Sequence, residues 1–141
     1  MEQRLSLITL GVVNLERSKS FYEALGWRGQ EVERTVFFQA GGIAIVLWSR
    51  EQLAADAGVT DAGADFGGIV LAHNVRSKHE VDQTLALATT AGGEVTQTAR
   101  HTAYGGYAGY FRDPDGHIWE VAFNPGFSLD ENGNLTIPRL Q

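Results

Sequence analysis

Glu120 is the residue whose type and position point most directly to chemistry. It lies in the middle of an apolar run, His117 to Phe123, that is typical of a strand. Alternation along that strand places Glu120 on one face with Ile118 and Ala122. A carboxylate among apolar neighbours is costly unless a metal, a base or hydrogen-bond donors satisfy it. No catalytic residue is assigned from the sequence, but Glu120 is the best candidate, as a general base, as a clasp for a cationic or hydroxylated ligand, or as an acid held by Tyr or Arg.

Aromatic side chains supply the second group of candidates. The segment HTAYGGYAGYF, residues 101–111, flanks its aromatic and His side chains with Gly, which makes a poor core. We interpret it as a flexible flap over a ligand. Of the four His residues, only His101 is expected to reach a site. The predicted ligand-binding residues are Trp48, His101, Tyr104, Tyr107, Tyr110 and Glu120.

Two copies of one βαβββ unit must position these side chains. In the first, Asn14 caps a helix that Gly26 ends, and extended segments surround it. In the second, Ser77 and Glu80 form a capping box at the start of the corresponding helix. A fold with such an internal repeat is built from two similar modules.

The repeat predicts an α+β fold of two βαβββ modules, residues 5–49 and 67–124, joined by an inserted helix and loop at 50–66. Together they make a single domain, 1–125, followed by a C-terminal hairpin or tail at 126–141. Each sheet has one face that its helix does not cover. We expect the bare faces to form an open eight-stranded cup, which is a natural small-molecule site.

The composition excludes several classes of function. The 141 residues carry a formal charge of −6 with scattered Lys and Arg, which disfavours nucleic acid and anionic membranes as partners. The absence of Cys removes disulfides, thiol nucleophiles and zinc–thiolate sites. No signal peptide and no 18-residue apolar span is legible, so a cytoplasmic protein is expected.

The opening TLGVVNLERSKSFYEALGW, the closing FRDPDGHIWEVAFNP and the two repeats together resemble the vicinal oxygen chelate superfamily. That group includes glyoxalase I, extradiol dioxygenases, fosfomycin-resistance enzymes and bleomycin-binding resistance proteins. The resemblance extends to about Pro125 and implies the glyoxalase/bleomycin resistance fold. It also implies that modules pair within or across chains, so a homodimer is expected.

Activity in that superfamily usually rests on a divalent metal, whose ligands lie on the first and last strands of each module. Carried over by position, Leu7 stands for the first His or Gln, Val46 or Leu47 for a Glu, and Gly68 for the second His. Only Glu120 matches. One carboxylate cannot supply the three or four protein ligands that such a site needs, so we predict no metal and no other cofactor.

The sequence thus favours binding of a small organic molecule in an aromatic-lined cup without the usual metal. Sequestration of an antibiotic is one instance, and a cationic guest would suit Glu120 and the aromatic rings. The alternative is an enzyme, a lyase, isomerase or dioxygenase with an atypical metal or acid–base site that includes Glu120 and His101. A structural dimerisation module is the third possibility.

Overall fold

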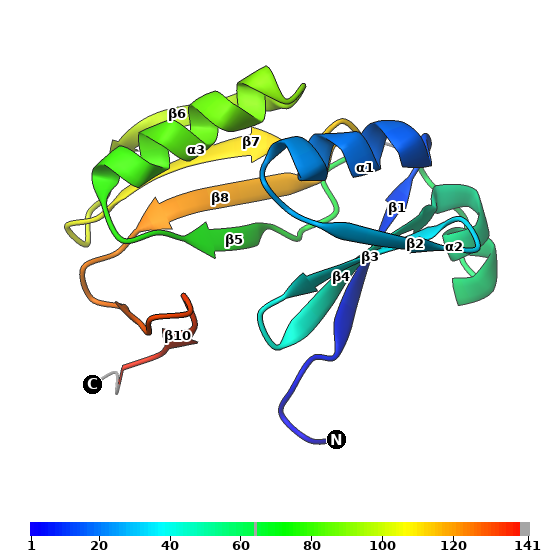
Figure 1. Ribbon diagram of the computed structural model, residues 1–141, viewed down its shortest axis with the longest axis horizontal. Coiled ribbons are helices and arrows are strands. Elements are labelled where there is room, and N and C mark those ends of the chain that lie inside the picture. Colours follow the sequence, from blue (N-terminus) through cyan, green and yellow to red (C-terminus); the bar gives the residue numbers. More distant parts are fainter. Residues whose placement is uncertain (64, 139–141) are drawn as a thin grey trace. The chain divides into compact units, whose positions relative to one another are not determined.

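The computed structural model describes residues 1–63 and 65–138 of the chain. The chain divides into two compact units, Met1–Gly67 with Pro114–Gly116, and Gly68–Asp113 with His117–Gln141. Each unit holds one βαβββ module with a mixed four-stranded sheet (Figure 1). The predicted α+β fold is therefore confirmed. In the part of the chain that the structure describes, no helix is long and apolar enough to cross a membrane.

The first unit contains the N-terminal module and the inserted helix. Its elements are β1 (Leu7–Val12), α1 (Leu15–Ala24), β2 (Gly29–Val32), β3 (Thr35–Ala40), β4 (Ile43–Ser49) and α2 (Arg50–Ala57). The strand order is β1-β4-β3-β2, with β1 parallel to β4 and the other pairs antiparallel.

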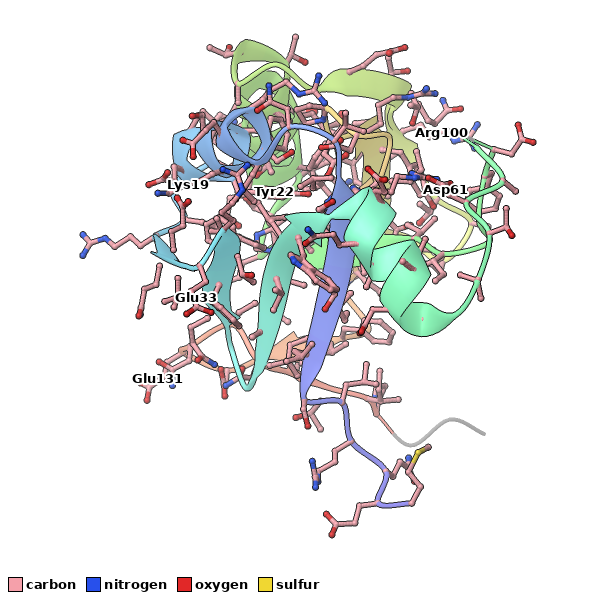
Figure 2. All side chains as sticks on the ribbon, turned by 90° about the vertical axis from the view of Figure 1, so that its right-hand side faces the viewer. Lys19, Tyr22, Glu33, Asp61, Arg100 and Glu131 are labelled. Atoms are coloured by element: carbon pink, nitrogen blue, oxygen red, sulfur yellow. The ribbon has the colours of Figure 1, made fainter. Side chains whose placement is uncertain are left out.

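Helix α1 forms where the sequence predicts it, because both of its ends carry the expected signals. The Asn14 side chain accepts the Arg17 N–H at 3.0 Å, and Gly26 takes the left-handed conformation after the helix with φ 101°. Tyr22 is fully buried between α1 and the sheet (Figure 2). Its ring stacks on Trp27 and contacts Phe38 of β3 with centroids 5.5 and 5.7 Å apart, which fixes the helix on that face.

The loop after α2 is held by a two-pronged ion pair. Arg50 donates to both carboxylate oxygens of Asp61, which Figure 2 labels, at 2.6 and 2.8 Å, and to the carbonyl of Gly63. The hydrogen bond from Arg50 lowers the pKa of Asp61 to about 2. The contact is therefore complete above the ordinary pKa of Asp and is lost as the pH falls toward 2.

The second unit contains the C-terminal module and a short hairpin. Its elements are β5 (Leu71–Asn74), α3 (Lys78–Thr90), β6 (Glu94–His101), β7 (Tyr107–Arg112), β8 (Ile118–Phe123), β9 (Ser128–Leu129) and β10 (Leu135–Thr136). The strand order of the larger sheet is β5-β8-β7-β6, with β5 parallel to β8. The last strands, β9 and β10, pair antiparallel within the predicted C-terminal segment 126–141, whose residues 139–141 lie outside the described ones.

Helix α3 covers one face of this sheet (Figure 1). Ser77 caps it by accepting the Glu80 N–H at 3.2 Å, while the Glu80 carboxylate accepts the N–H of Arg76 instead of that of Ser77. The helix buries Val81, Leu85 and Ala88. Among residues 68–113 and 117–138 no other helix is present, so the opposite face of the sheet has no helix from these residues on it, as the sequence predicts.

The turn between β7 and β8 carries two Asp residues with different partners. Asp113 stays with the second unit, where its carboxylate accepts the His117 N–H at 2.8 Å and lies 2.7 Å from the His117 ring nitrogen Nδ1. Asp115 is counted with the first unit, because its carboxylate accepts from the Ser18 hydroxyl, the Val13 N–H and the Arg17 guanidinium. Pro114 and Gly116 are typical turn residues, but nothing local in the sequence indicates the partners of the two Asp side chains.

Candidate functional site

The register of β7 against β8 sorts the candidate side chains onto two faces. The two strands pair without interruption from Tyr107 opposite Phe123 to Arg112 opposite Ile118. The Tyr107 hydroxyl donates to Asp82 of α3, so Tyr107 faces the helix. Since side chains alternate along a strand, Tyr110 lies on the other face, which α3 leaves uncovered.

Glu120 and Tyr110 form the centre of this uncovered face. They lie opposite each other on β8 and β7, and the Tyr110 Oη donates to the Glu120 Oε2 at 2.6 Å. Both side chains are half-buried. Gln97 of β6 lies opposite Tyr110, and Ala72 of β5 lies opposite Glu120. The carboxylate therefore has a phenol on one side and a methyl group on the other.

The hydrogen bond changes the chemistry of the phenol. The pKa of Tyr110 rises to about 12, first because its hydroxyl donates to Glu120, then because of burial and the negative charge of Glu120. Tyr104 also raises this pKa, and Arg100 lowers it. The uncovered face thus combines an acid, a neutral phenol and, at Arg100 opposite Ala108, a cation, while Tyr104 lies in the turn between β6 and β7.

The other predicted residues lie elsewhere. His101 and Tyr107 lie opposite each other on β6 and β7, with ring centroids 5.2 Å apart, on the face that α3 covers. Trp48 belongs to β4 in the first unit, where it lies beside Gly11. The structure thus pairs Tyr110 with Glu120, while the sheet separates His101 from Glu120.

The segment predicted to be a flap is instead a strand with a tight turn before it. Residues 107–111 belong to β7, and only 102–106 link β6 to β7. The Thr102 N–H donates to the Gly106 carbonyl, and the Gly106 N–H donates to the Thr102 hydroxyl, both at 3.0 Å. These bonds close the turn. The prediction of a flap is wrong for residues 107–111, because they belong to a strand of the sheet. The Gly residues serve the turn and the close packing of the strands.

Sequence reasoning missed three residues that shape the two faces. Asp82 lies 25 positions before Tyr107, and no spacing rule connects them. Gln97 and Arg100 are three positions apart, so on a regular strand their side chains would lie on opposite faces of the sheet. Both instead pair with residues of the uncovered face, Tyr110 and Ala108. The register shift between Gln97 and Arg100 produces this arrangement, and such an irregularity leaves no clear mark in a sequence.

The metal site that the resemblance implies does not fit the residues present. Glu120 is engaged with Tyr110, and its neighbour on β5 is Ala72. Among residues 1–63 and 65–138 no group of three or more His, Cys, Asp or Glu side chains is arranged to hold a metal ion. Gly68, at the position of the second His, precedes β5 and carries no donor side chain. We therefore derive no chemical step through a metal.

The hydrogen bond between Tyr110 and Glu120 predicts a raised pKa for Tyr110, which a titration can test. Because the pKa of Tyr110 is raised, the stabilisation it brings is complete below the ordinary Tyr pKa of about 10 and is lost as the pH rises through about 12. Glu120→Gln should return the Tyr110 step toward about 10 in an ultraviolet titration, because the negative acceptor is gone. Tyr110→Phe identifies the step by removing it. A Tyr110 step that stays near 12 in Glu120→Gln would assign the shift to burial instead.

Comparisons with known proteins agree with this architecture. Residues 4–121 match the model of the Glyoxalase/Bleomycin resistance protein/Dioxygenase superfamily. The structure of a glyoxalase-related enzyme from Fulvimarina pelagi is 37% identical, with a TM-score of 0.90 over 97% of this chain and 99% of that one. No curated protein matches the chain.

Two more distant structures extend the likeness. A hypothetical protein from S. aureus is 27% identical, with a TM-score of 0.76 over 87% of this chain and 94% of its own. A glyoxalase/bleomycin resistance protein/dioxygenase family enzyme from Burkholderia phytofirmans PsJN is 18% identical, with a TM-score of 0.71 over 84% and 96%, which shows the fold alone. Because the family model spans most of the chain and the βαβββ modules are present, this chain belongs to the Glyoxalase/Bleomycin resistance protein/Dioxygenase superfamily.

Proposed function

We propose that this protein binds a small organic molecule, without a metal, on the uncovered face of the β5-β8-β7-β6 sheet. The observation that carries the proposal is the half-buried carboxylate of Glu120, which Tyr110 holds in place on a sheet face that has no helix of its unit over it. An acid in this setting is pre-organised to accept a hydrogen bond or a positive charge from a ligand.

The contacts of Glu120 favour a ligand with a donor or cationic group. Its Oε2 accepts from Tyr110, and within residues 1–63 and 65–138 no donor is bound to its Oε1. A ligand ammonium or hydroxyl at Oε1 would complete the hydrogen bonding of the carboxylate. Tyr104 is 54% exposed and offers a ring on which an apolar part of the ligand can stack. Sequestration of a cationic antibiotic is one function of this kind.

A binding experiment with matched variants tests the proposal. A thermal-shift screen of cationic antibiotics, catechols, thiols and dicarbonyls should yield a ligand, whose affinity is then measured by calorimetry. For a cationic or hydroxylated ligand, Glu120→Gln should weaken binding about 10- to 150-fold, because a hydrogen bond to a charged group contributes about 1.5–3 kcal/mol. Glu94→Gln removes the same charge from β6 and should leave the affinity unchanged. Equal affinities for the three proteins would contradict the proposal.

An enzymatic function is the second candidate, because the 37% identical structure from Fulvimarina pelagi is described as a glyoxalase-related enzyme. On this hypothesis the chain is a lyase, isomerase or dioxygenase whose atypical site includes Glu120. Metal analysis of protein purified without chelator separates the two candidates. One tightly bound equivalent of metal that is lost in Glu120→Gln would favour the enzyme and contradict the metal-independent binding site.

A further inference from the structure

A hollow lies between α3 and β6 in the second unit, on the face of the sheet opposite Glu120. It has a volume of about 330 Å³, which is at the lower end of the range for small-molecule sites. Its lining includes Asp82, Leu85, Ala86, Val95, Ala99 and Tyr107. None of the residues discussed under the proposed function lines it, so this is a separate feature of the molecule.

The hollow exists because the side chains between α3 and β6 are small at this point. Ala86 on the helix and Ala99 on the strand leave the space between the two elements open. Leu85 does not fill it, because its side chain packs against Gly109 of β7, where an added Cβ would come within 2.5 Å of Leu85 Cδ1. Leu85, Ala86 and Ala99 therefore give the hollow an apolar floor, and the hydroxyl-bearing Thr89 and Thr98 complete its lining.

One end of the hollow carries a negative charge. Asp82 accepts from the Tyr107 hydroxyl at 2.8 Å, and none of the lining residues is Lys, Arg or His. The hydrogen bond to Asp82 raises the pKa of Tyr107, so the phenol stays neutral and continues to donate near neutral pH. The Tyr107 ring, which also contacts the His101 ring, lies beside this carboxylate. A carboxylate next to an aromatic face is the arrangement that attracts organic cations.

We propose that this hollow is a second small-molecule site, selective for ammonium compounds with a short aromatic or branched hydrocarbon body. The ammonium group lies against Asp82 and the ring of Tyr107, and the hydrocarbon body covers the floor formed by Leu85, Ala86 and Ala99. The hollow is shallow and Asp82 is exposed, so affinity is modest and selectivity for charge is the distinguishing property.

Nuclear magnetic resonance titration with phenethylammonium tests the proposal, with 2-phenylethanol as the neutral probe. Phenethylammonium should shift the amide signals of residues 82–89 and 95–99, and the alcohol should bind about tenfold more weakly because it lacks the charge. Asp82→Asn should cause a similar loss. Ala86→Leu, at an exposed helix position, should fill the hollow and abolish the shifts. Asp56→Asn, the same change on α2, is the matched control and should bind like the unaltered protein.

The outcomes separate this site from the one in the proposed function. Shifts centred on Tyr110 and Glu120 would overturn the inference while supporting the other site. Equal affinity for amine and alcohol, or full binding by Asp82→Asn or Ala86→Leu, would overturn it as well. If no ligand binds around Glu120, the expectations for this hollow are unchanged, because the two sites share no residue.

Discussion

Asp115→Ala is expected to lower the free energy of unfolding by about 3 kcal/mol, because it removes the acceptor of a buried hydrogen-bond cluster. The Asp115 side chain is 1% exposed. It accepts from the Ser18 hydroxyl at 2.5 Å, from the Val13 N–H at 2.9 Å and from the Arg17 guanidinium at 3.3 Å. Ser18 is completely buried, so its hydroxyl cannot turn to water when Asp115 is lost.

Chemical denaturation, followed by both fluorescence and circular dichroism, measures this effect. Asp115→Asn keeps the shape and one acceptor oxygen and should cost less than Asp115→Ala. Asp56→Ala removes an exposed acid from a helix and should change the free energy of unfolding by less than about 0.5 kcal/mol. If Asp115→Ala were no more costly than Asp56→Ala, the cluster would have no role in stability.

Gly109→Val is expected to be comparably severe, at about 3 kcal/mol, for a steric reason. A Cβ at Gly109 would come within 2.5 Å of Leu85 Cδ1, 3.0 Å of the Ala99 nitrogen and 3.1 Å of the Ala99 Cα. The side chain of Leu85 can move, but the backbone of β6 cannot yield without losing its pairing with β7. The branched side chain of Val must therefore displace α3, β6 or both.

Thermal unfolding of three glycine variants checks this prediction. Gly42→Ala is the control, because no atom lies within 4 Å of the position of its Cβ. Its melting temperature should match that of the unaltered protein, with Gly109→Ala in between and Gly109→Val lowest. If Gly109→Val had the same melting temperature as Gly42→Ala, the packing of Leu85 and β6 against β7 would be less tight than the structure shows.

Contacts between residues far apart in the chain could not be predicted from the sequence. Ser18 and Asp115 are 97 positions apart, and Asp82 and Tyr107 are 25 apart, so no local pattern relates them. By contrast, the sequence is sufficient to predict that Tyr107 and Tyr110 lie on opposite faces of the sheet, because they are an odd number of positions apart on one strand. That alternation is incompatible with a flap over residues 107–111, which are one strand.

The sequence by itself determined the elements and the family. Helix caps at Asn14 and Ser77, the helix stop at Gly26 and the repeated βαβββ order are local signals. Local geometry is set by residues near one another in the chain. Tertiary structure alone decided which side chains meet. In the folded chain Tyr110 pairs with Glu120, His101 lies on the opposite face of the sheet, and a hollow lies beside Asp82. These outcomes depend on strand register and on packing between distant segments, which are determined only when the whole chain has folded.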